Sequence, residues 1–140
     1  MLRQATTTLE FATKRQGLVE VTRPIIEWVE QVAIVEGLLT IFCRHTSASL
    51  LINENAAPEV REDLEAYFAR IAPEDPTAYM HDDEGPDDMP AHLRTALTQV
   101  QLSIPVIDGR LALGTWQGIY LFEHRRRSHR RSLAIHLIGQ

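Results

Sequence analysis

Two short polar segments of this chain place side chains that could do chemistry at the edges of apolar runs. Residues 44–49 read RHTSAS and follow one apolar run, and residues 113–118 read LGTWQG and precede another. Such runs are typical of strands, and the end of a rigid strand can present polar groups to a ligand. We therefore expect His45 and Gln117 to lie at strand ends and to face a ligand.

Histidines and acids provide a second chemical signal. His81 and His92 lie in and just after one long predicted loop, with Asp87 and Asp88 between them. Together with His45, two or three imidazoles and a carboxylate could form an open transition-metal site or a general acid–base cluster. The chain has no HExxH, CxxC or EF-hand pattern, so spacing alone identifies no metal. A histidine on an apolar strand is also common as a hydrogen-bonded structural residue, which is the alternative for His45.

Nucleophilic catalysis has weaker support. Cys43 and His45 lie two positions apart on one predicted strand, where side chains stand side by side and do not point at each other. We interpret Cys43 as a small core residue. Ser47 and Ser49 lie outside any GxSxG context, which argues against a serine hydrolase.

The LGTWQG segment allows a sharp turn because it contains two glycines. Trp116 could fill the core, or it could form a flat wall for a heterocycle that the Gln117 amide orients. Neither glycine-rich stretch matches a P-loop or a GxGxxG fingerprint, so the sequence does not support nucleotide binding of those kinds.

Charge is unevenly distributed along the chain. The formal net charge is −5, which argues against general nucleic-acid binding. Residues 123–131 nevertheless hold five arginines in nine positions. We interpret this basic segment either as a solvated hairpin tip or as an anion-binding rim, because guanidinium groups suit phosphate oxygens.

Length and composition indicate one globular domain, residues 1–140, with no apolar run long enough to cross a membrane. The first residues lack the apolar core of a signal peptide, and the one cysteine cannot form an internal disulfide. We therefore expect a cytoplasmic protein without a membrane or nucleic-acid partner.

Hydrophobic periodicity predicts an α+β fold. Strands are expected at residues 4–12, 17–21, 38–44, 49–53, 101–107, 110–113, 119–123 and 132–138. Helices are expected from an N-cap at Thr22 to a stop at Gly37, over 58–71, and over 91–97. The second helix should bury a stripe formed by Val60, Leu64, Tyr67, Phe68 and Ile71.

Residues 73–90 are predicted to be loop, with four prolines and seven acids. A loop this long in a compact domain is usually functional or disordered. Asp108-Gly109 between two apolar runs predicts a hairpin turn.

Three stretches of the chain resemble the YjbQ-like family, also labelled secondary thiamine-phosphate synthase. They are residues 37–54 (GLLTIFCRHTSASLLINE), 91–93 (AHL) and 103–117, in which SIPV is followed by GRLALGTWQ. The likeness spans nearly the whole chain. It implies a β-sandwich-like YjbQ-like fold with antiparallel sheets and two or three helices, a homotrimer, and a polar pocket near the subunit boundaries. The implied activity is a weak joining of a pyrimidine diphosphate to a thiazole phosphate, which yields thiamine phosphate and pyrophosphate.

The resemblance carries over to motif positions of this chain. It implies functional roles for His45, Thr46, Ser47, Asn53, Glu54, His92, Gly114, Thr115, Trp116 and Gln117. The chain departs from many relatives in its loop, where residues 86–92 read PDDMPAH in place of a run similar to NADAH. Asp88 still provides an acid four positions before His92.

These observations give three candidate sets. The catalytic candidates are His45, Thr46, Ser47 and His92. The ligand-binding candidates are Asn53, Glu54, Thr115, Trp116, Gln117 and Arg125, with the arginines of residues 125–131 expected to steady a phosphorylated substrate. The candidate ligands of a divalent metal, zinc or magnesium, are His45, His81, Asp88 and His92.

Three functions are open at this stage. The first is the weak thiamine-phosphate synthase activity that the resemblance implies. The second is a non-enzymatic protein that binds a metal or a small ligand. The third is a metal-dependent hydrolase of a small phosphorylated compound.

Overall fold

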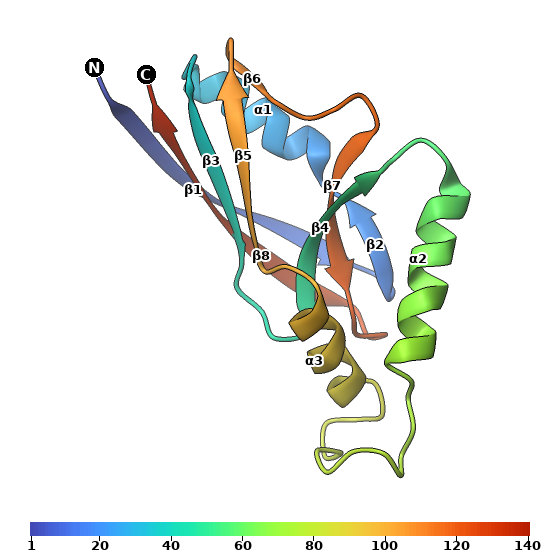
Figure 1. The fold of residues 1–140 in the computed structure, drawn as a ribbon. Helices are drawn as coiled ribbons and strands as arrows, with labels where there is room; N and C mark the ends of the chain where they lie inside the picture. The colour runs from blue at the N-terminus through green and yellow to red at the C-terminus, as the bar shows by residue number, and fades with distance from the viewer.

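Two antiparallel β-sheets form the framework of the protein (Figure 1). The computed structural model describes residues 1–140. The larger sheet has the strand order β1-β8-β3-β5-β6, with β1 Arg3–Thr13, β3 Gly37–Cys43, β5 Gln101–Ile107, β6 Arg110–Leu111 and β8 His129–Gly139. The smaller sheet has the order β2-β7-β4, with β2 Gly17–Glu20, β4 Ala48–Glu54 and β7 Gln117–Glu123. Helices α1 (Thr22–Val32), α2 (Pro58–Ile71) and α3 (Asp88–Leu97) complete the predicted α+β fold.

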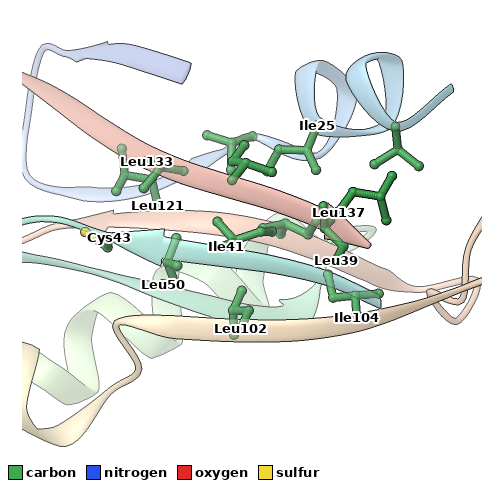
Figure 2. Packing of buried hydrophobic residues seen from close by; sticks show 14 of the residues in the cluster. Ile25, Leu39, Ile41, Cys43, Leu50, Leu102, Ile104, Leu121, Leu133 and Leu137 are labelled. Carbon is green, nitrogen blue, oxygen red and sulfur yellow. The ribbon is translucent and has the colours of Figure 1, made fainter. Parts of the chain in front are cut away.

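The main core lies between the two sheets. Side chains from both sheets and from α1 meet in one cluster of 17 buried residues, and Figure 2 shows Leu39 and Ile41 of β3 in it with Leu121 of β7. Because side chains alternate along a strand, Ile119 and Leu121 face this core while the next residues, including Phe122, face the other way. The smaller sheet is therefore apolar on both faces.

Helix α2 covers the second apolar face of the smaller sheet (Figure 1). Leu64 and Phe68 pack against a small cluster that contains Tyr120 and Phe122. The predicted buried stripe was partly wrong, since no residue of α2 is fully buried and Tyr67 is 49% exposed. Of the predicted stripe, Leu64 and Phe68 pack against the apolar cluster of the sheet, while Tyr67 and Ile71 are exposed.

The ends of α1 also differ from the prediction. Val21, not Thr22, occupies the N-cap position, and the Thr22 hydroxyl instead accepts a hydrogen bond from the Ile119 amide at 2.8 Å. The helix ends before Ala33, which adopts a left-handed conformation with φ 59°. Gly37 does not stop the helix but begins β3, where a side chain would collide with the carbonyl oxygen of Ile138 in β8.

Two further differences concern the segments that build the candidate site. Helix α3 begins at Asp88, so the predicted loop is shorter than expected at its C-terminal end. The basic segment is not a hairpin tip, because β7 and β8 belong to different sheets and residues 124–128 cross between them. This crossing segment, α3 and the loop before α3 lie at the same end of the molecule (Figure 1). None of the three helices is long and apolar enough to span a membrane.

A buried polar network ties this end of the molecule together. His124 is fully buried, and its Nε2 lies 2.8 Å from the Ser49 hydroxyl of β4. Ser49 in turn contacts the Thr98 hydroxyl at 2.5 Å, which donates to the carbonyl oxygen of Arg94 in α3. Burial, reinforced by the charges of Arg94 and Arg131, lowers the pKa of His124 to about 3. His124 is therefore a neutral structural residue.

The buried His124 predicts a specific pH dependence of stability. The unfolded imidazole binds a proton near its ordinary pKa of 6.5, whereas the folded one binds it only near 3. Between these values the unfolded state holds more protons, so the free energy of unfolding decreases as pH falls, by up to about 1.4 kcal/mol per pH unit. His124→Gln keeps an amide donor and removes the titration. Denaturant unfolding in EDTA between pH 6.5 and 4.5 should show a shallower decline for the variant, and equal slopes would contradict this account.

Candidate functional site

Helix α3 and the loop before it bring four potential metal ligands together. Asp88 and His92 lie one helical turn apart on the same face of α3. One Asp88 oxygen, Oδ2, lies 2.7 Å from His81 Nε2 and 3.1 Å from His92 Nε2. With a carboxylate oxygen of Glu84, these ligand atoms all lie within 4.8 Å of one another. We call His81, Glu84, Asp88 and His92 the loop–helix cluster.

The hydrogen bonds of His92 determine which nitrogen faces the cluster. Its Nδ1 lies 3.0 Å from the carbonyl oxygen of Thr46, which can only accept, so Nδ1 carries a proton and donates it. In the neutral ring, Nε2 then presents a lone pair toward Asp88 Oδ2, which is also an acceptor. Two acceptors at this distance need a proton or a cation between them. The hydrogen bond to Asp88 raises the pKa of the exposed His81.

The other oxygen of Asp88 faces a positive charge. Arg125 Nη1 donates to Asp88 Oδ1 at 2.7 Å, and Arg125 Nε donates to Asp87 Oδ2 at 3.2 Å. Burial by itself would raise the pKa of Asp88, but the hydrogen bonds from its neighbours, His81 first, and the charge of Arg125 outweigh it and hold that pKa below its ordinary value. Asp88 is therefore an ionised carboxylate. One of its oxygens accepts a hydrogen bond from Arg125, and the other is directed at the imidazoles of His81 and His92.

This donor set fits a divalent transition metal. Two imidazole nitrogens and two carboxylate oxygens are typical zinc ligands, whereas magnesium prefers oxygen ligands and retained waters. The orientation of His92 by Thr46, and of Asp88 by Arg125, is the kind of outer contact that metal ligands usually have. Of the two predicted metals, the donor atoms favour zinc.

A small cavity adjoins the cluster on the loop side. Its volume is about 210 Å³, and it is lined by Asp75, Pro76, Tyr79, His81, Asp82, Gly85, Pro86 and Met89. Ligand pockets for drug-sized molecules are usually larger, about 300–1,000 Å³. Within one chain, this space suits a single small ligand.

The structure separates His45 from the loop–helix cluster, which corrects the expectation that it shares a metal with His92. His45 Nε2 accepts a hydrogen bond from the Ser132 amide at 2.8 Å, which ties the segment after β3 to β8. Burial, followed by the charge of Arg131, lowers the pKa of His45. The structural interpretation of this histidine therefore fits its contacts.

The neighbours of His45 have different surroundings. Thr46 is exposed and contributes its carbonyl oxygen to His92. Ser47 is buried, and its hydroxyl accepts a hydrogen bond from Arg131 Nη2 at 3.0 Å. Of these two, only Thr46 touches the loop–helix cluster.

Most arginines of the basic segment bind acidic residues of the same chain. Arg126 pairs with Glu74, and Arg130 pairs with Glu10 at 2.6 Å. Arg131 is buried and donates from Nε to Glu123 Oε1 at 2.7 Å. The segment is therefore neither a hairpin tip nor a set of wholly free arginines, although Arg126, Arg127 and Arg130 are exposed.

The remaining candidates lie at the other end of the smaller sheet. Glu54 pairs with Gln117 in the β4–β7 register, so both are separated from Arg125 by the length of β7, which is about 20 Å for a seven-residue strand. Glu54 Oε2 accepts the Ala57 amide before α2, and Asn53 Oδ1 accepts the Glu54 amide. Within one chain, the loop–helix cluster and the ligand-binding candidates at this end form two separate groups.

The turn before β7 also lies in this second group. Trp116 is 63% exposed, so it does not fill the core. Thr115 is exposed as well, and Gln117 Oε1 accepts the Gly114 amide at 2.8 Å. With Asn55 and Leu113, Gln117 lines a groove of about 470 Å³ beside α1. The exposed indole remains available to a ligand or a partner.

Three residues that matter for the site were not predicted from the sequence. Glu84 joins the cluster three positions after His81, and this spacing within an acidic loop was the available signal. The buried pair of Glu123 and Arg131 gave no signal, because two charged residues in a basic run usually lie in solvent.

Gln117→Ala tests the role of the turn. The substitution removes the acceptor for the Gly114 amide, so we expect it to lower the free energy of unfolding by about 0.5–1.5 kcal/mol. Zinc affinity should stay unchanged, because Gln117 and the cluster lie at opposite ends of β7. Thermal melting and zinc titration of the same variant provide the comparison. A loss of zinc affinity without loss of stability would contradict this separation.

Comparison with known proteins agrees with the fold and the motifs. The family model described as "UPF0047 protein YjbQ-like" matches residues 7–140. A UPF0047 protein of Synechocystis is 48% identical over 138 residues, covering 99% of this chain and 94% of that protein. The UPF0047 protein YjbQ of Salmonella typhimurium is 44% identical over 134 residues, covering 95% and 96%.

Solved structures show the same likeness. A YbjQ-like protein of unknown function from Sulfolobus solfataricus superposes with a TM-score of 0.91 at 25% identity and covers 100% of both chains. A conserved hypothetical protein from Thermus thermophilus superposes with a TM-score of 0.77 at 34% identity, covering 92% of this chain and 97% of that one. The chain therefore belongs to the YjbQ-like UPF0047 family.

Proposed function

We propose that this protein binds a divalent metal ion, preferably zinc, at the loop–helix cluster and presents it to the phosphate of a small phosphorylated ligand. The observation that carries this proposal is the convergence of two imidazole nitrogens on one carboxylate oxygen of Asp88. In its neutral form His92 directs a lone pair at that oxygen, and a metal cation between them would relieve the contact between two acceptors. When bound, a divalent metal supplies positive charge to phosphate oxygens.

The surrounding residues support binding and orientation. Thr46 fixes the ring of His92, and the hydrogen bond from His81, with the charge of Arg125, keeps Asp88 ionised. The arginines of the basic segment are largely engaged with Asp87, Asp88, Glu74, Glu10 and Glu123. A bound metal would add positive charge that is not already paired with an acid of the same chain.

Metal binding is the first test. Protein dialysed against a chelator should bind zinc in a calorimetric titration. His92→Ala removes one ligand and should weaken the zinc affinity by about 100-fold or more. Loss of an outer contact of a metal site costs about 10- to 100-fold, and loss of a ligand should cost at least as much.

His45→Gln is the matched control, since His45 lies outside the cluster and a glutamine can still accept the Ser132 amide. It should bind zinc like the unsubstituted protein. Equal losses for both variants would show that the cluster does not hold the metal.

The thiamine-phosphate synthase reaction is the specific activity that the family resemblance suggests. It needs a pyrimidine diphosphate and a thiazole phosphate at the same time, and the 210 Å³ cavity beside the cluster is small for both. A second chain would have to provide further walls. Hydrolysis of one phosphorylated compound needs less space. Binding of a metal or of one ligand without turnover needs no space for a second substrate.

Product analysis separates these functions. Zinc-loaded and metal-free protein would be incubated with the two thiamine precursors, and with each phosphorylated heterocycle alone. Thiamine phosphate with pyrophosphate supports the synthase, and inorganic phosphate from one heterocycle supports the hydrolase. Zinc binding without either product supports a binding protein.

We also propose a homotrimer, in which the open face of the larger sheet makes the subunit contacts. No helix covers this face, and Leu38 and Phe42 of β3 are exposed on it at 42% and 45%. Thr6, Thr8, Thr40, Ala134 and His136 surround Phe42 on the same face. An exposed aromatic residue surrounded by side chains that include no acid, lysine or arginine is typical of the core of a protein interface.

Light scattering tests the assembly. The unsubstituted protein should have about three times the 15.9 kDa mass of one chain. Phe42→Arg should shift the mass toward one chain, because an arginine would be buried without a partner. Tyr67→Arg, at a similarly exposed aromatic residue of α2, should leave the mass unchanged. A monomeric mass for the unsubstituted protein at micromolar concentration would refute the trimer.

A further inference from the structure

Arg125 contacts three parts of the segment that builds the loop–helix cluster. Its Nη1 donates to Asp88, its Nε donates to Asp87, and its Nη2 donates to the carbonyl oxygen of Glu84 at 2.8 Å. All three guanidinium nitrogens therefore donate to the loop before α3 or to the start of α3, and these two segments carry the four potential ligands. The side chain is 18% exposed.

Each contact restricts a different part of the cluster. The bond to Asp88 Oδ1 leaves Oδ2 directed at the imidazoles of His81 and His92. The bond to the Glu84 carbonyl holds the backbone of a second ligand next to Gly85. Gly85 has φ +104°, a backbone conformation that residues other than glycine rarely adopt. The glycine at this position therefore favours the turn that follows Glu84.

Arg125 itself is held from the protein interior. Its backbone amide donates to Glu123 Oε2 at 3.1 Å, and Glu123 is fully buried against Arg131 and Thr13. The neighbouring His124 is anchored to Ser49 of β4. The guanidinium therefore projects from a rigid part of the sandwich into the loop.

We propose that Arg125 is a positioning residue for the metal ligands Asp88 and Glu84. It orients these two ligands through its hydrogen bonds to them and does not bind the phosphate. This inference rests on the proposed metal site. A planar guanidinium can bind two carboxylates and a carbonyl at once, whereas an ammonium acts as a single point charge. Both geometry and charge are therefore needed for the full effect.

Metal titration of three variants tests the inference. Arg125→Gln removes the charge, and Arg125→Lys keeps the charge without the planar guanidinium. Arg126→Gln is the control. The Arg126 side chain pairs with Glu74 of the same region, and only its backbone amide donates to Asp87. Calorimetry would give the zinc affinity, and the visible absorption of the cobalt(II) form would report the coordination geometry. Melting in EDTA would give the stability of the metal-free fold.

Arg125→Gln should weaken zinc affinity about 10- to 100-fold, the usual effect of losing an outer contact of a metal site, and should change the cobalt(II) spectrum at saturation. Arg125→Lys should recover part of the affinity but not the spectrum. Arg126→Gln should retain both. If Arg125→Gln does not fold, Arg125→Lys carries the test through its altered spectrum and lower affinity.

The outcomes separate the two proposals. Unchanged affinity and spectrum in Arg125→Gln, with zinc bound by the unsubstituted protein, would overturn the positioning role alone. An equal loss in Arg126→Gln would also overturn it, since general anchoring of the loop would then explain the effect. Absence of zinc and cobalt binding by the unsubstituted protein would overturn the proposed metal site, and this inference with it.

Discussion

The buried ion pair between Glu123 and Arg131 connects the two sheets at the end that carries the loop–helix cluster. Glu123 ends β7 of the smaller sheet, and Arg131 lies in β8 of the larger one. Thr13 of β1 donates a further hydrogen bond to Glu123 at 2.6 Å, and Arg131 also donates to Ser47. These bonds outweigh the effect of burial, so the pKa of Glu123 lies below its ordinary value. Removing one partner of such a pair typically costs about 3–5 kcal/mol, because the other charge remains buried.

The contribution of this pair is mainly positional. A well-packed apolar pair can often replace a buried ion pair without loss of stability, so the pair by itself is weak evidence for a stable fold. It does determine where residues 124–128 leave the sandwich, because Glu123 also accepts the Arg125 amide. Arg125 and Arg126 start from that point and reach Asp87, Asp88 and Glu74. The candidate metal site thus depends on a charged contact inside the core.

Complementary charge explains how an acidic loop and a basic segment far apart in the chain come together. Asp87 accepts from the Arg125 side chain and the Arg126 backbone, while Asp88 divides its two oxygens between Arg125 and the histidines. Two successive acids therefore have different roles, one anchoring the crossing segment and one facing the cluster. The exposed turn with Trp116 lies at the far end of β7 and does not share this network. One chain thus presents two separate polar regions on one rigid sheet.

Local patterns in the sequence were enough to predict most of the elements. Alternation located β5 over residues 101–107 and helical spacing located α2 over 58–71, because period and turn chemistry act between residues close in the chain. Asp108 and Gly109 adopt the positive φ values expected of a hairpin turn. The motifs also pointed to His81, Asp88 and His92, which the structure brings together with Glu84.

Only the tertiary structure decided how these parts are used. Whether β7 and β8 form a hairpin depends on strand pairing across the whole chain, and they belong to different sheets. His45 and His92 are equally plausible ligands by residue type, but the side chain of one is bound to Ser132 and that of the other faces Asp88. The five clustered arginines gave no sign in the sequence that four of them pair with acids, because most of these partners, such as Glu10 and Asp87, are distant in the chain. Contacts between residues far apart in the chain leave no periodic pattern in the local sequence. Composition and spacing therefore determine the elements and the candidate residues, and packing determines which candidates meet.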